Sequence, residues 1–119
     1  MSPEAFEAAA LALPATEKVV QWGGADVYKV GGRVFALRTL EGALSIKVSD
    51  VAYAVLVETG QARPAPYLAR AKWVAFDRLE ALDEDEVRGW LASAHALVAA
   101  RLTRKARAEL GLSSGFSTL

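Results

Sequence analysis

Glycines divide residues 18–48 into four short segments, and this pattern limits the fold more than any other feature of the sequence. The segments cover residues 18–22, 27–30, 33–40 and 44–48, separated by Gly23-Gly24, Gly31-Gly32 and Gly42. They are rich in the β-branched and aromatic residues that favour strands, and glycine is the residue that tight turns most readily accept. Because connections this short join neighbouring antiparallel strands, the sequence predicts an antiparallel meander.

The last of these segments alternates strictly between apolar and polar residues. Leu44, Ile46 and Val48 alternate with Ser45 and Lys47. Successive side chains of a strand point to opposite faces, so the alternation predicts a sheet with one covered face and one face exposed to water. The cover must come from helices that pack on one face of the sheet.

Helix signals stand on both sides of the meander. A first helix is predicted from Ser2, a hydroxyl cap, to Pro14, which ends it. A second helix begins at Ser49 and stops before Gly60. Its helical spacing places three residues on the inner side: Val51, Val55 and Leu56.

The second half of the chain predicts one more strand and the longest helix. Residues 61–70 contain two prolines and are expected to be irregular or briefly helical, and residues 72–76 are predicted to form a strand. Asp83 and Glu86 form a capping pair, apolar residues then recur at helical spacing as far as Leu102, and the helix is predicted to run to Leu110 before Gly111. The predicted order is helix, four strands, helix, strand, helix, which is an α+β fold.

Composition limits the possible classes of protein. The chain has 119 residues, of which 53% are hydrophobic, and it contains no cysteine. We expect one domain over residues 1–111, a monomer, with a flexible tail over residues 112–119 that is rich in Ser and Gly. No apolar run approaches the roughly 20 residues that span a bilayer, so no membrane association and a cytoplasmic location are predicted.

The sequence offers no catalytic constellation. His95 is the only histidine, and the helical spacing puts it at the flank of the apolar stripe. Ser93 is two residues away, and such neighbours do not face each other on a helix. The acidic residues between 80 and 86 suit a solvated helix start better than a metal site, and the glycine pairs lack the context of a phosphate-binding loop. We therefore predict a protein that is not an enzyme and has no metal or cofactor.

Positive charge is balanced overall but is locally clustered. Lys plus Arg and Asp plus Glu number 14 each. Residues 61–78 carry four cations against Asp77 alone, and a second basic cluster ends the last predicted helix. Cations at these places either keep a surface and a helix end solvated or contact phosphates, and spacing alone leaves both interpretations open.

Several segments, in their order and spacing, resemble the MmcQ/YjbR-like bacterial proteins. The matching segments are Val27-Tyr28-Lys29-Val30-Gly31-Gly32-Arg33-Val34-Phe35-Ala36-Leu37, Leu44-Ser45-Ile46-Lys47-Val48, Pro64-Ala65-Pro66-Tyr67-Leu68, Lys72-Trp73-Val74 and residues 93–105. The resemblance covers residues 6–105. It implies a CyaY-like fold in which helices cover one face of an antiparallel sheet, sometimes described as a double-wing arrangement.

The resemblance also implies a function, because that family is commonly described as DNA-binding. It predicts weak DNA binding of low sequence specificity, through phosphate contacts on the sheet face and neighbouring loops. The candidate residues, with the basic cluster of the last helix added, are Lys29, Arg33, Arg38, Lys47, Arg63, Arg70, Lys72, Arg101, Arg104 and Lys105. The sequence departs from the family at the Gly-Gly-Lys turn, where Arg33 stands in place of lysine, and in its neutral charge balance.

Two other functions remain open at this stage. Frataxin-like relatives of the fold bind iron through an acidic first helix, but this chain offers only Glu4 and Glu7 there, so iron is not expected. The main alternative to DNA is a protein partner or a small ligand in an aromatic-lined cleft. Its candidate residues are Trp22, Tyr67 and Trp73.

Overall fold

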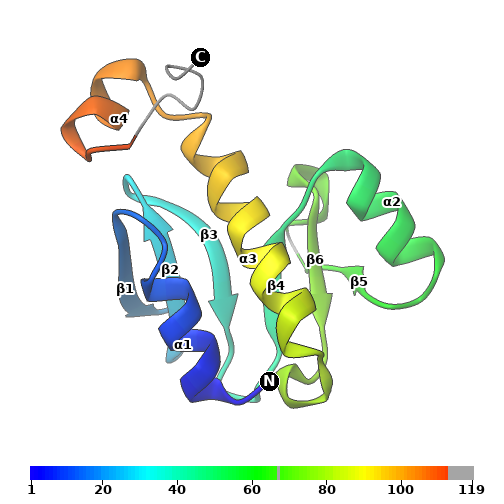
Figure 1. Cartoon of the computed structure of the whole chain (residues 1–119). Coiled ribbons are helices and arrows are strands. Elements are labelled where there is room, and N and C mark those ends of the chain that lie inside the picture. Colours follow the sequence, from blue (N-terminus) through cyan, green and yellow to red (C-terminus); the bar gives the residue numbers. More distant parts are fainter. Residues whose placement is uncertain (67, 113–119) are drawn as a thin grey trace.

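The computed structural model describes residues 1–66 and 68–112 of the chain, and it is an α+β fold (Figure 1). The helices are α1 Pro3–Leu11, α2 Asp50–Glu58, α3 Glu84–Ala99 and α4 Arg104–Glu109, with two short 3₁₀ turns, η1 Ala69–Ala71 and η2 Leu79–Ala81. The strands are β1 Thr16–Gln21, β2 Ala25–Val30, β3 Arg33–Arg38, β4 Leu44–Lys47, β5 Arg63–Pro64 and β6 Trp73–Phe76. The expected fold class is thus confirmed.

The strands form one antiparallel sheet in the order β1-β2-β3-β4-β6-β5. The predicted meander is present as β1 to β4, and β6 then pairs with β4. A two-residue strand, β5, occupies part of the segment that was expected to be irregular. Pro64 lies in β5 at the edge of the sheet, where its missing N–H removes no hydrogen bond from a central ladder.

The main core lies between the sheet and the helices. Helix α3 crosses the sheet over β3 and β4, and α1 lies beside it on the same face (Figure 1). Phe6 of α1 packs edge-to-face on Tyr28 of β2, with ring centroids 5.4 Å apart. Phe35, Leu91 and their neighbours complete a fully buried layer. Burial of this layer is the main force that fixes the helices on the sheet.

The second face of the sheet is partly covered, which corrects the expectation of a wet face. Ser45 and Lys47 do point to this face, but only 8% of Ser45 is exposed. A second apolar cluster lies there, formed by Ala25, Val27, Leu37, Ala65, Trp73 and Ala75. Part of the cover comes from the segment around β5, since Ala65 is buried in this cluster and Leu68 packs against it. The pairing of β5 with β6 holds this segment on the second face. Alternation within β4 identified the two faces but not this covering segment.

Helix α2 uses a different inner face from the predicted one. Ser49 caps it as expected, accepting a hydrogen bond from the amide of Ala52 at 3.1 Å. Leu56 is buried, but Val51 and Val55 are 75% and 50% exposed. The helix packs against the β5–β6 edge, so only the side that carries Tyr53 and Leu56 meets the core.

The predicted last helix is two helices. Helix α3 ends at Ala99, and Thr103 begins α4 by accepting a hydrogen bond from the amide of Ala106 at 3.0 Å. The side chain of Arg107 donates to the carbonyl oxygens of Ala100 and Leu102 and stabilises the bend. A hydroxyl residue inside an apolar stripe is the signal for this break, because threonine favours helix starts over helix interiors.

The expected tail falls mostly outside the described residues, since residues 113–119 are not among them. Within the described part of the chain, no helix has both the length and the apolar character needed to cross a bilayer.

Candidate functional site

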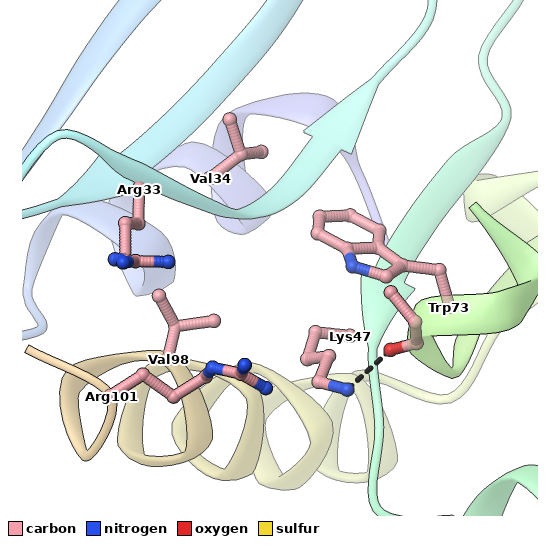
Figure 2. A pocket seen from close by; sticks show the side chains of 7 residues that line it. Arg33, Val34, Lys47, Trp73, Val98 and Arg101 are labelled. Atoms are coloured by element: carbon pink, nitrogen blue, oxygen red, sulfur yellow. Dashed lines mark hydrogen bonds between the residues drawn. The ribbon is translucent and has the colours of Figure 1, made fainter. Parts of the chain in front are cut away.

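A pocket forms where β3 and β4 separate. Only Ala36–Arg38 of β3 pair with Leu44–Ile46 of β4, whereas the first half of β3 has no partner on that side. A register shift at Tyr28 and Lys29, where β2 pairs with β3, accompanies this divergence. Such a bulge bends a strand and increases its twist. The resulting notch, closed by the end of α3, is a pocket of about 360 Å³ (Figure 2).

Three cationic side chains and no carboxylate line the pocket. The lining consists of Arg33 and Val34 of β3, Lys47 of β4, Ala71, Trp73 of β6, and Val98 and Arg101 at the end of α3. Figure 2 shows the basic groups approaching from three elements, Arg33 from β3, Lys47 from β4 and Arg101 from the end of α3. We call Arg33, Lys47 and Arg101 the cationic triad. Such a lining favours anions.

Lys47 shows the effect of this concentration of charge. Its ammonium group donates a hydrogen bond to the carbonyl oxygen of Ala71. Burial lowers the pKa of Lys47 below its usual value, the charge of Arg101 lowers that pKa further, and Asp50 partly opposes them. The pocket is therefore a site where one more positive charge is unfavourable and a negative charge is favourable.

Arg33 and Arg101 are exposed and have no carboxylate within ion-pair distance in residues 1–66 and 68–112. Arg33 follows the Gly31–Gly32 turn directly. Arg101 lies in the bend between α3 and α4, where its amide donates to the carbonyl of Val98 at 3.0 Å. The side chain of the neighbouring Leu102 packs against Gly31, in the turn that precedes Arg33.

Apolar side chains also line the pocket. Trp73 is only 6% exposed and its ring lies on the same side as Lys47, whereas Val98 lies on α3 between Arg33 and Arg101 (Figure 2). Trp73 is paired with Lys47 in the β4–β6 ladder, so the aromatic ring and the ammonium group come from neighbouring strands.

Other predicted basic residues surround this end of the molecule. Arg70 and Lys72 flank the pocket residue Ala71, and the ammonium group of Lys72 lies 4.9 Å from the centroid of the Tyr53 ring. Lys29 pairs in register with Glu17 across β1 and β2, which places an acidic residue opposite it. Arg104 and Lys105 are exposed on the first turn of α4.

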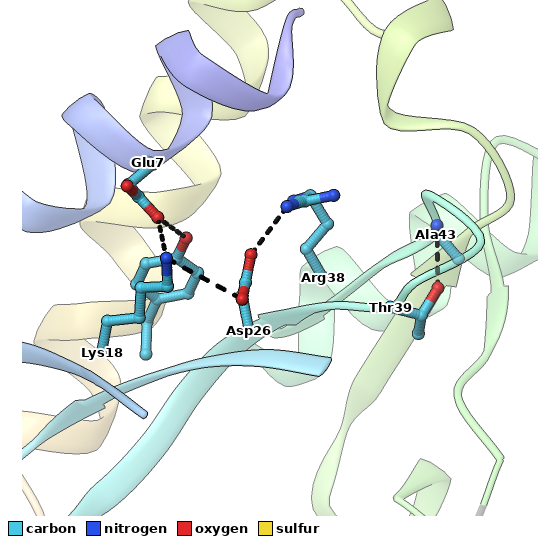
Figure 3. Close-up of polar contacts among 7 residues, drawn as sticks. Glu7, Lys18, Asp26, Arg38, Thr39 and Ala43 are labelled. Carbon is cyan, nitrogen blue, oxygen red and sulfur yellow. Dashed lines mark hydrogen bonds and ion pairs between the residues drawn. The ribbon is translucent and has the colours of Figure 1, made fainter. Parts of the chain in front are cut away.

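Two predicted basic residues are neutralised elsewhere. Arg38 forms an ion pair of 2.7 Å with Asp26 on the helix side of the sheet (Figure 3). Arg63 forms an ion pair of 2.7 Å with Asp77. Because a carboxylate already balances each charge, these arginines are poorer phosphate ligands than the cationic triad.

The group around Arg38 includes a buried tyrosine. Lys18 bridges Glu7 at 2.6 Å and Asp26 at 3.9 Å, and the hydroxyl of Tyr28 donates to Glu7 (Figure 3). The hydrogen bond from Lys18 lowers the pKa of Glu7, whereas burial raises the pKa of Tyr28. These contacts join α1 to β1 and β2, which is a structural role.

The residues of the predicted aromatic cleft do not all come together. Trp22 is 63% exposed in the turn between β1 and β2, whereas Trp73 lines the pocket. In the sheet order β2, β3 and β4 lie between these two places. Tyr67 is outside the described residues. Trp73 alone therefore carries the aromatic character of the described pocket.

His95 is a core residue, not a residue at the flank of the apolar stripe. It is 7% exposed, and its ring lies edge-to-face against Phe35, with ring centroids 5.3 Å apart. The turn after α1 covers the position that helical spacing alone assigned to the boundary. Among the described residues, no three His, Asp or Glu side chains gather as a metal site would require.

Sequence reasoning named four of the seven lining residues, but in two separate sets. Arg33, Lys47 and Arg101 belonged to the basic set and Trp73 to the aromatic set. Val34, Ala71 and Val98 carried no chemical signal, because small and aliphatic residues are common everywhere. The separation of β3 from β4 brings these residues together, and no local pattern encodes it.

Comparison with known proteins identifies the family. No curated protein matches the sequence significantly. The crystal structure of protein DR2400 from Deinococcus radiodurans, described as having the domain DUF419, superposes with a TM-score of 0.78 at 23% sequence identity, over 90% of this chain and 86% of that one. This likeness shows a shared fold. The model of the YjbR family matches residues 11–97, which include all the strands and most of α3. The chain belongs to the YjbR family.

Proposed function

We propose that this protein is a non-enzymatic DNA-binding protein that contacts phosphate groups with the end of the molecule where the pocket lies. The observation that carries the proposal is the convergence of the cationic triad from β3, β4 and the end of α3, with no carboxylate in the lining. Guanidinium groups bind phosphate oxygens with two parallel hydrogen bonds, and an ammonium group adds a point charge.

The distribution of charge supports the same surface. The chain has no net charge, so attraction to DNA must be local. Arg70 and Lys72 extend the positive region beyond the pocket, whereas Arg38 and Arg63 are engaged with Asp26 and Asp77. Binding through a few phosphates without contacts to base edges is weak and has low sequence specificity.

The experiment is a fluorescence-anisotropy titration with short duplex and single-stranded DNA at two salt concentrations. We expect binding whose affinity falls roughly tenfold or more between about 50 and 200 mM salt, because bound cations release counterions from DNA. The double variant Arg33→Gln with Arg101→Gln should weaken binding. The slope of the logarithm of the binding constant against the logarithm of the salt concentration should also become shallower. The change is about one unit for each phosphate that the variant no longer neutralises.

Arg63→Gln is the matched control, since it removes the same kind of charge from an arginine that is already paired with Asp77. It should bind DNA nearly as the wild type does. Binding that does not depend on salt, or that Arg63→Gln weakens as much as the double variant does, would contradict the proposal.

A small anionic ligand is the second candidate, and the size of the pocket favours it. A volume of about 360 Å³ lies within the range of roughly 300–1,000 Å³ that is usual for small-molecule sites. This candidate becomes the better one if no DNA binds even at low salt while a small phosphate ester still protects the protein against thermal unfolding.

A further inference from the structure

We propose that the pocket binds a terminal phosphate, a phosphomonoester at the end of a DNA strand, in preference to the internal phosphodiesters of the backbone. This inference rests on the proposed function and names its ligand. It follows from the charge of the cationic groups, from their number and from the apolar surface beside them.

The first argument is charge. A phosphomonoester carries about −1.5 to −2 charges near neutral pH, whereas an internal phosphodiester carries one. The pocket offers the cationic triad and no lining carboxylate. Lys47 is half-buried, and its pKa is lowered because burial and the nearby charge of Arg101 disfavour its proton. A dianion compensates this accumulated charge better than a monoanion does.

The second argument is the number of oxygen atoms. A terminal phosphate has three oxygens without an ester bond, and an internal phosphate has two. Arg33 reaches the pocket from β3, Lys47 from β4 and Arg101 from the end of α3 (Figure 2). Three separate cationic donors can each take an oxygen of their own only when three oxygens are free, which requires that a single ester bond leaves the phosphate.

The third argument is the wall beside the charges. Trp73 and Val34 add apolar surface to the same pocket beside Lys47 (Figure 2). The sugar or base that follows a terminal phosphate has apolar surface to place against this part of the lining. Inorganic phosphate has no apolar surface that could contact this part of the lining.

The test compares identical single-stranded oligonucleotides with a 5′-phosphate, a 3′-phosphate or only hydroxyl ends, as unlabelled competitors in anisotropy. We expect a phosphorylated end to compete roughly tenfold better than the hydroxyl form, since charge-assisted hydrogen bonds are the strong ones. The advantage should disappear in the double variant Arg33→Gln with Arg101→Gln and remain in Arg63→Gln. Circular dichroism and thermal melting verify that each variant is folded.

Further competitors separate the two sources of a phosphomonoester. Nucleoside 5′-monophosphate and inorganic phosphate should compete at least tenfold more weakly than the phosphorylated oligonucleotide, because only a strand also contacts Arg70 and Lys72. If the mononucleotide competes equally well, the ligand is a small phosphate ester, and the inference about DNA ends is wrong.

Failure of this inference differs from failure of the proposed function. Equal competition by phosphorylated and hydroxyl oligonucleotides, with both weakened by the double variant, overturns the preference for ends and leaves phosphate-mediated DNA binding intact. Absence of binding by every oligonucleotide at low salt overturns both.

Discussion

The imidazole Nε2 of His95 lies 2.7 Å from the carbonyl oxygen of Pro14, and this contact joins the centre of α3 to the turn that follows α1. A carbonyl oxygen only accepts, so the ring nitrogen is the donor. The ring also packs edge-to-face against Phe35 of β3. His95 therefore holds together three segments that are far apart in the sequence.

Replacing His95 should reduce stability without altering the pocket. His95→Ala leaves the carbonyl of Pro14 unpaired and opens a cavity beside Phe35, and we expect the free energy of unfolding to fall by about 2 kcal/mol or more. His95→Gln keeps a donor and should lose less. Urea denaturation measures both changes. DNA binding at low temperature should stay within about twofold of wild type, and loss of binding in a folded variant would instead assign His95 a functional role.

Two adjacent glycines provide a matched pair for testing the turn that positions Arg33. Gly31 and Gly32 both have positive φ, but a Cβ at position 31 would lie 2.7 Å from a methyl group of Leu102, whereas a Cβ at position 32 meets nothing within 4 Å. Gly32→Ala should cost about 1–2 kcal/mol for its left-handed backbone. Gly31→Ala should cost about 1 kcal/mol more because Leu102 must move.

Movement of Leu102 also displaces its neighbour Arg101. Gly31→Ala should therefore weaken binding of a phosphorylated oligonucleotide more than Gly32→Ala does, measured at a temperature where both variants are folded. Equal effects of the two substitutions on stability and on binding would show that the contact with Leu102 does not position the pocket.

The pH dependence of stability should reveal the charge in the pocket. Burial and Arg101 lower the pKa of Lys47 in the folded protein below the ordinary value of 10.5, which it keeps when unfolded. The unfolded state therefore binds more protons between these two pKa values, and stability rises with pH across that interval. Lys47→Gln removes the cost of keeping a charged ammonium group in the folded protein. The variant's gain in unfolding free energy relative to wild type should therefore be largest at neutral pH and decrease toward pH 10.5. Urea denaturation at a series of pH values tests this, and a difference that does not vary with pH would contradict it.

Binding of an anion has the opposite dependence on this group. A bound phosphate favours the protonated form of Lys47, so affinity should decrease as pH rises through its lowered pKa. Lys47→Arg keeps its charge throughout this range and is the control that should lose affinity less. Anisotropy titrations with a phosphorylated oligonucleotide at a series of pH values measure the difference, and identical pH profiles for the two proteins would show that Lys47 does not bind the phosphate.

The predicted caps and the predicted periodicity were largely correct because they depend on neighbours within a few residues. Ser2, Ser49 and Asp83 each cap the helix that the sequence predicted, and the glycine-separated segments are strands. Thr103 carries the same kind of local signal, but apolar residues continue at helical spacing on both sides of it, and this spacing wrongly predicted one unbroken helix.

The sequence by itself determined the strands, the caps and the α+β class, because backbone preferences and side-chain periodicity act locally. Tertiary structure alone decided which basic residues line the pocket and which form ion pairs. Arg38 meets Asp26 through the pairing of β2 with β3, whereas Arg33 and Arg101 line one pocket because the end of α3 packs over the notch between β3 and β4. Charges become partners or a binding site only when distant segments approach, and the approach is set by the packing of the whole core.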